Sequence, residues 1–167
     1  MRIYLPVTMN ELRGLHANSR LAPSPLAAHA ITADFLAATA EIDDEEREYQ
    51  ALMAAANESL QLIASTVGEP RRVVISADVD DQYVHRRRGV ATAVEVSTEI
   101  SLRQCSSVHI DEVGAQAAVA AAVTGLGSSP GSTSTTGEDS AGTDSIYDLD
   151  DHELLWFATQ EIPDLLV

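Results

Sequence analysis

Hydrophobic and polar residues alternate at the very start of the chain. Residues 2–7 place Ile3, Leu5 and Val7 on one side of an extended segment, a pattern that predicts a β-strand. A second strand is expected over residues 26–31, where alanine makes the signal weaker.

Two helices are predicted to begin at capping residues in this half of the chain. Thr8 is followed three residues later by Glu11, the spacing of a capping box, so a helix is expected from there to about residue 19. A shorter helix is expected to begin at Thr32 or Asp34, because both residue types accept hydrogen bonds from the first helical N–H groups.

Asp43 and Asp44 are expected to cap the longest predicted helix, and its first turn is rich in acidic residues that suit a helix N-terminus. Its apolar residues recur at steps of three and four. They are Tyr49, Leu52, Met53, Ala56, Leu60, Ile63 and Val67. Gly68 and Pro70 end this stripe, which at 1.5 Å per residue gives a helix of about 33 Å, long enough to cross a domain.

Strand patterns return in the second half. Residues 71–79 are apolar enough for a central strand, and residues 90–96 and 107–111 predict two more, followed by an alanine-rich helix over 114–123. Residues 1–126 are therefore predicted to form one α+β domain. We expect a mixed sheet of about five strands covered by helices, with at least one parallel pair and a ferredoxin-like layout as the nearest simple arrangement.

A change of composition separates this domain from the C-terminus. Fourteen of the nineteen residues from 127 to 145 are Ser, Thr or Gly, which predicts a disordered linker over 127–147. Residues 148–167 then carry the single Trp and many Leu, an apolar content that predicts a helix packing back on the domain. Asp150 or Asp151 is its expected N-cap, and Pro163 is expected to stop it.

A helical projection divides this C-terminal segment into two faces. The apolar face comprises Leu154, Leu155, Phe157, Ala158 and Ile162. The opposite face comprises His152, Glu153, Trp156 and Gln160, which we take as candidate binding residues. A Trp on a polar helix face is unusual, so either a second layer buries it or it belongs to a ligand or partner site.

The formal charge of −16 limits the classes of partner. Nine of the 26 acidic residues, and no Arg or Lys, lie within residues 138–167, and all ten basic residues of the chain are Arg. Such a field disfavours nucleic acid and anionic membranes, whereas basic proteins or cations are natural partners. No segment approaches the length of a membrane span, so a cytoplasmic protein is expected. The lone Cys105 excludes an internal disulfide and is expected to be a small buried hydrophobe.

Motifs for phosphate loops, zinc proteases or serine hydrolases are absent from the sequence, and no cofactor is predicted. One alternative is a small metal-dependent hydrolase whose ligands could come from four residues. They are His109, Asp111, His152 and Glu153. A second charged cluster could be a cation or phosphate site, or only a surface loop whose charges offset one another. Its members are Asp78, Asp80, Asp81, Arg86, Arg87 and Arg88.

Several segments resemble a family of small uncharacterised actinobacterial proteins, a domain of unknown function. They are the opening MRIYLPVTMNEL, the segments RRVVISADV and SSVHIDEV, and the ending DDHELLWFATQEIPDLL. The resemblance covers nearly the whole chain outside the Ser/Thr/Gly tract, and DHELLW…QEIP is its most specific part. It implies a cytoplasmic protein with no established activity, and it transfers no catalytic residue.

The sequence thus predicts a small acidic cytoplasmic protein that acts as a non-catalytic binding or regulatory module for an unidentified protein partner. The metal-dependent hydrolase remains the alternative reading. A homodimer formed through the C-terminal segment is a third hypothesis.

Overall fold

A computed structural model describes residues 1–22, 24–127, 149 and 152–167. The described strands are β1 (Arg2–Val7), β2 (Arg20–Leu21), β3 (Leu26–His29), β4 (Val73–Asp78), β5 (Val84–Arg86), β6 (Ala93–Val96), β7 (Ile100–Ser101), β8 (Cys105–Asp111) and β9 (Leu154–Ala158). The described α-helices are α1 (Met9–Asn18), α2 (Ala33–Ala38), α3 (Asp44–Ser65), α4 (Gln116–Gly127) and α6 (Ile162–Leu165). The predicted linker, residues 127–147, lies almost wholly outside the described residues.

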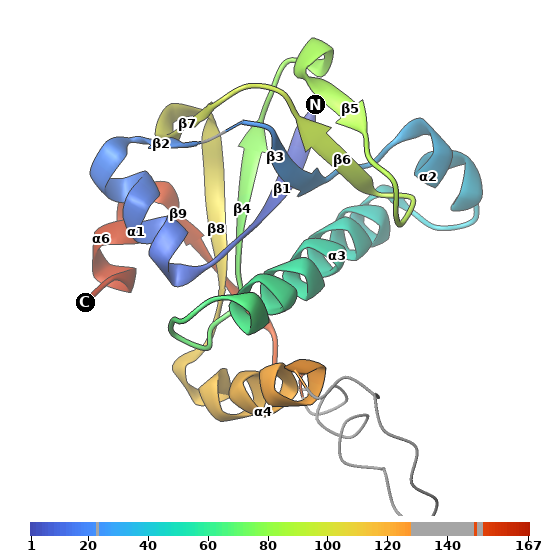
Figure 1. Cartoon of the computed structure of the whole chain (residues 1–167). Coiled ribbons are helices and arrows are strands. Elements are labelled where there is room, and N and C mark those ends of the chain that lie inside the picture. Colours follow the sequence, from blue (N-terminus) through green and yellow to red (C-terminus); the bar gives the residue numbers. More distant parts are fainter. Residues whose placement is uncertain (23, 128–148, 150–151) are drawn as a thin grey trace, which may run out of the picture.

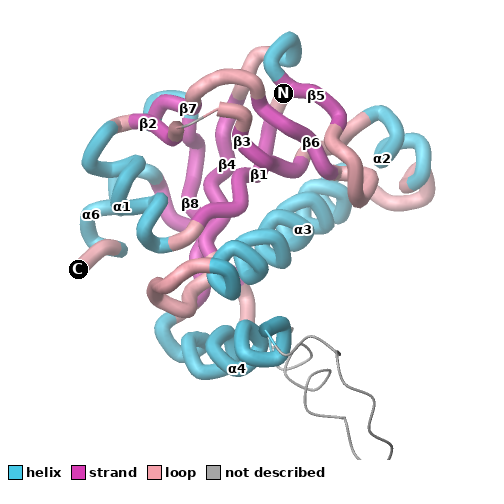
Figure 2. The backbone as a smooth tube through the Cα atoms, in the orientation of Figure 1, coloured by secondary structure: helices cyan, strands magenta, loops and turns pink. Residues whose placement is uncertain are grey.

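The predicted α+β class is confirmed. Seven strands form one sheet in the order β5-β6-β3-β1-β4-β8-β9, while β2 and β7 form a separate pair (Figures 1 and 2). The most apolar strand, β4, lies between β1 and β8, the central position that its sequence predicts.

The predicted parallel pair is wrong, because every described strand pairing is antiparallel. A β-α-β order normally returns the second strand parallel to the first. Here the chain leaves α1 through the short strand β2 and reverses before β3, so β3 runs against β1. The sheet also has seven strands where about five were expected, in an order unlike the simple layout proposed.

Helices lie on both faces of the sheet (Figure 1). Ile3, Leu5 and Val7 of β1 pack with Leu12 and Leu15 of α1, in a core cluster to which α6 also contributes. The alternate residues face α3. Tyr4 and Val74 pack there against Ala51, Ala55 and Ala56. Small residues on α3 allow the helix to approach the sheet closely. Tyr49 and Val67, at the ends of the predicted stripe, are exposed, and Val67 lies beyond the end of α3.

The C-terminal helix predicted over 148–167 is wrong for its central part. Residues 154–158 form β9, and only the short helix α6 follows. Five apolar residues in a row do not distinguish a strand from a helix by periodicity, and Trp and Phe favour strands. Pro163 lies in the first turn of α6, so it helps to begin a helix where it was expected to end one.

Capping at the start of α1 is confirmed. The Glu11 N–H donates to Thr8 Oγ1 at 3.3 Å, and the Thr8 N–H donates to Glu11 Oε2 at 2.7 Å. We expect Thr8→Ala to lower the free energy of unfolding by about 1 kcal/mol, measured by urea denaturation, because the helix loses its N-cap acceptor. Thr98→Ala is the control, since Thr98 lies outside any helix. Equal stability of the two variants would contradict the role of the cap.

Candidate functional site

The last strand, β9, forms one edge of the main sheet and pairs with β8 (Figure 1). Its side chains alternate between the two faces. Phe157 packs into the cluster beneath α1, whereas Leu154 packs against the cluster beneath α3. Trp156 shares the face of Leu154 because the two residues are two positions apart. It nevertheless remains 61% exposed, the largest apolar side chain on this edge that faces solvent.

A buried ion pair fixes the start of this strand against the sheet. The Arg72 guanidinium donates to Asp111 Oδ1 at 2.8 Å, and the two side chains are 2% and 0% exposed. The Arg72 backbone N–H also donates to Asp111 Oδ2 at 2.6 Å. A further guanidinium bond, 3.2 Å long, reaches the carbonyl oxygen of His152, just before β9. The segment that carries Trp156 is therefore held at a fixed position.

The outer edge of β9 presents unpaired backbone groups. The Asp111 N–H donates to the carbonyl oxygen of Arg72, the residue before β4, at 3.1 Å, so Asp111 and alternate residues of β8 direct their backbone groups toward β4. The β9 residues opposite this set include Leu154 and Trp156. In an antiparallel ladder their N–H and C=O groups point away from β8, toward an edge with which no described strand pairs.

One position of this edge is already closed. The Ala158 N–H, the next in the outward-facing series, donates to Glu161 Oε2 at 2.7 Å. The open part of the edge is therefore short and is centred on Leu154 and Trp156. Short edges of this kind limit uncontrolled pairing between sheets.

His109 lies directly opposite Trp156 in the β8–β9 ladder. Its Nε2 is 3.2 Å from Ser76 Oγ and 3.1 Å from Ser107 Oγ, and burial lowers the pKa of the ring. Burial thus favours the neutral form of this ring, whose Nε2 lies within hydrogen-bond distance of two hydroxyls.

The four predicted binding residues do not share a helix face, because the helix is absent. His152 and Glu153 precede β9, Trp156 lies within it, and Gln160 belongs to the 3₁₀ turn after it. His152 Nδ1 lies 3.0 Å from Glu112 Oε1. The role of the four residues in binding stays a prediction, with Trp156 as the member that the edge strand presents most openly.

The four residues of the metal alternative are not brought together. No group of three or more His, Cys, Asp or Glu side chains suited to a metal ion occurs among the described residues. Asp111 is engaged by Arg72, and His152 by Glu112. Burial also raises the pKa of Cys105 to about 11, so its thiolate is scarce at neutral pH.

The predicted cluster of aspartates and arginines is likewise divided. Asp78 pairs with Arg2 at 3.0 Å, whereas Asp81 pairs with the N-terminal amine at 2.8 Å. Arg86 lies 3.3 Å from Asp34, and Arg87 pairs with Glu58 of α3. The arginines therefore belong to the opposite edge of the sheet and face helices, apart from the aspartates beside them in the sequence.

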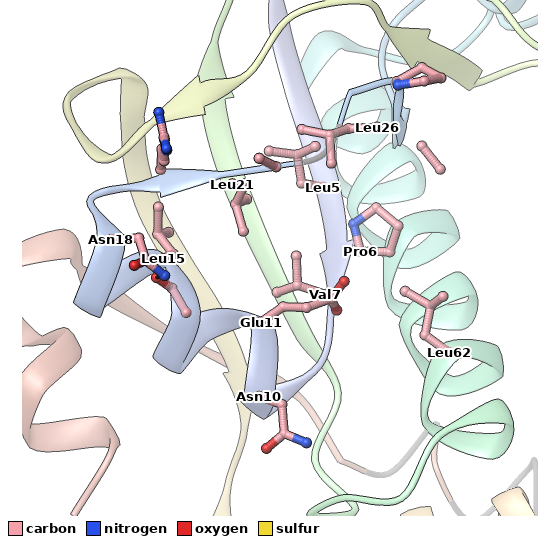
Figure 3. Close-up of a pocket in the computed structure, with 15 residues that line it drawn as sticks. Leu5, Pro6, Val7, Asn10, Glu11, Leu15, Asn18, Leu21, Leu26 and Leu62 are labelled. Carbon is pink, nitrogen blue, oxygen red and sulfur yellow. Dashed lines mark hydrogen bonds between the residues drawn. The ribbon is translucent and has the colours of Figure 1, made fainter.

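A groove of about 500 Å³ opens between α1, β1 and Leu62 of α3 (Figure 3). Its floor is apolar, and its polar side chains already have partners within the protein. Glu11 belongs to the cap of α1, Asn18 donates to Gly14 O at 3.0 Å, and Arg20 pairs with Glu99 at 3.4 Å. Without free polar groups that converge on it, the groove offers little to orient a substrate.

A family model described as a family of unknown function, DUF6912, matches residues 1–166. The chain belongs to the DUF6912 family. No curated protein matches it, and neither does any solved structure. In this DUF6912 member, no described helix is long and apolar enough to cross a membrane.

Proposed function

We propose that the protein is a non-catalytic binding module that captures an extended, basic segment of a partner protein along β9. The observation that carries this proposal is the 61% exposed Trp156 on an edge strand with unpaired backbone groups. An added strand would bond to the N–H and C=O groups of Leu154 and Trp156, and the indole would cover an alternate side chain of the segment.

Charge favours a basic occupant over the alternatives. Glu112 and Glu153 lie at one end of β9, Glu161 and Asp164 lie at the other, and all four are exposed. No Arg or Lys follows Arg103 in the sequence. A second copy of the chain would bring like charges together, and a nucleic acid would be repelled. An extended segment that alternates apolar and basic residues could pair with the backbone of β9 and also neutralise the acidic residues around it.

The test uses two fluorescein-labelled decapeptides, one alternating Val with Lys and the other alternating Val with Glu. We expect saturable binding of the Lys peptide to the full chain in fluorescence anisotropy, and no saturable binding of the Glu peptide. Trp156→Ala should weaken the binding of the Lys peptide by about 2 kcal/mol, roughly thirtyfold in Kd, because a central Trp commonly dominates such an interface.

Tyr83→Ala is the matched control, since Tyr83 is another exposed aromatic residue, next to β5 at the opposite edge of the sheet. It should bind as the wild type does. Equal affinity of Trp156→Ala and the wild type would reduce the interaction to general charge attraction and would refute the proposed role of β9.

A further inference from the structure

A second pocket, of about 310 Å³, lies between α3 and the loop that joins β5 to β6. The loop lies beside α3 in Figure 1, near the β5 edge of the sheet, which is the edge opposite β9. Asn57, Glu58 and Gln61 line the pocket from α3, while Arg87 and Arg88 line it from the loop. The volume lies at the lower end of the range for small-molecule sites.

A chain of hydrogen bonds forms the inner wall. Thr92 Oγ1 is 2.8 Å from His29 Nδ1, and His29 Nε2 is 2.9 Å from Glu58 Oε2. The same carboxylate oxygen accepts from Arg87 Nη2 at 2.5 Å. The network orients the Arg87 guanidinium at the pocket. It also resembles a catalytic relay in its residue types, but Thr92 is 4% exposed and therefore cannot serve as a nucleophile for a substrate.

The polar groups around this wall that have no hydrogen-bond partner within the described residues are mainly donors. Arg87 Nε is buried and has no partner among the described residues, and the Arg87 side chain as a whole is 31% exposed. Arg88 is exposed, and within the described part of the chain it makes no hydrogen bond or ion pair. The side-chain amides of Asn57 and Gln61 likewise make no hydrogen bond within the described part of the chain. Since the carboxylate of Glu58 is already bonded, the pocket offers an excess of donors and positive charge.

We propose that this pocket binds the phosphate or carboxylate group of a small molecule, with Arg88 as the principal cation and Arg87 as a second, pre-oriented one. The paired N–H donors of a guanidinium group match two oxygens of either anion. The amides of Asn57 and Gln61 would bond to its remaining oxygens. The loop turns at Gly89 with φ 135°, a conformation that other residues rarely adopt, and this keeps Arg88 at the mouth of the pocket. The site is separate from β9 and does not rest on the peptide-binding proposal.

The test follows the Gly89 amide in ¹H–¹⁵N spectra of the full chain at pH 7 and constant ionic strength. One titration uses inorganic phosphate, and the other uses succinate. We expect a saturable shift of this resonance with one or both anions. Arg88→Gln should weaken that binding about tenfold, because a charged donor without structural partners is removed.

Arg103→Gln is the matched control, since Arg103 is exposed and lies outside the pocket. This substitution changes the charge of the protein by the same amount as Arg88→Gln. It should leave the binding unchanged. Saturation by phosphate alone would assign a phosphorylated ligand, and saturation by succinate alone would assign a carboxylate. The proposal fails if neither anion gives a saturable shift at Gly89, or if both arginine variants weaken binding equally.

Discussion

Replacing Asp111 with alanine is expected to lower the free energy of unfolding by about 3–5 kcal/mol. The substitution leaves the Arg72 guanidinium, 2% exposed, without its ionic partner in the interior. It also removes the acceptor of the Arg72 backbone N–H. Urea denaturation followed by far-UV circular dichroism would measure the change.

Two further variants separate the ion pair from other effects. Asp164→Ala removes an exposed carboxylate near β9 and should change the stability by less than about 0.5 kcal/mol. Arg72→Met combined with Asp111→Leu removes both charges together and should recover much of the loss, because no unpaired charge stays buried. A cost below about 1 kcal/mol for Asp111→Ala would mean that water reaches the remaining guanidinium.

Acidification is expected to destabilise the protein through Glu58. Hydrogen bonds from His29 and Arg87 lower the pKa of this carboxyl from 4.5 to about 2 in the folded protein. A folded-state pKa below the unfolded value stabilises the protein fully above about pH 4.5, and this contribution disappears as the pH falls to about 2. The difference corresponds to about 3 kcal/mol as an order of magnitude. The Glu58→Gln variant should lack this contribution, so its free energy of unfolding should fall less steeply than that of the wild type as the pH is lowered.

Urea denaturation at several pH values between about 2 and 7 would compare the two proteins. Glu99→Gln is the control, since Glu99 forms an exposed pair with Arg20 that contributes little. Its stability should follow the wild type across the series. Parallel curves for Glu58→Gln and the wild type would show that the carboxyl is not stabilised in the folded state.

Local signals in the sequence predicted most of the elements. Thr8, Thr32 and Asp43 each accept a hydrogen bond from the first turn of the helix that they were expected to cap. The β1 strand has the predicted bounds, and β4 has the predicted central place. These features depend on residues that are neighbours in the chain, and such interactions can be inferred from spacing alone.

The same local signals could not predict which strands pair with each other when they are distant in the sequence. The two-residue strands β2 and β7 pair across Leu21↔Ile100, and strands so short leave no periodic pattern. The reversal of the chain between α1 and β3, which makes β3 antiparallel to β1, therefore could not be predicted. The assignment of β9 failed for a related reason, because its pairing with β8 decides its conformation.

The candidate sites differ in how far sequence could find them. Trp156 was identified because it did not fit a helical projection, and that misfit came from applying the helical period to a strand. The second pocket gave a partial signal, because Arg87 and Arg88 belong to the charged cluster that was considered as a cation or phosphate site, but their partners in the pocket were not predicted. His29, Glu58 and Arg87 come from β3, α3 and the β5–β6 loop, and only the folded chain brings them together.

Because β9 follows β8 only after a long intervening stretch, it joins the sheet late during synthesis. Its partner β8 ends at Asp111, and α4 together with residues 128–153 must be made before β9 emerges from the ribosome. Until then β8 is the edge of the sheet, and the Arg72 guanidinium lacks the carbonyl of His152. Before β9 is added, the sheet thus exposes an edge strand of 7 residues, whereas β9 has 5. Addition of β9 therefore replaces a longer unpaired edge with a short strand whose last outward-facing N–H, that of Ala158, is bonded to Glu161.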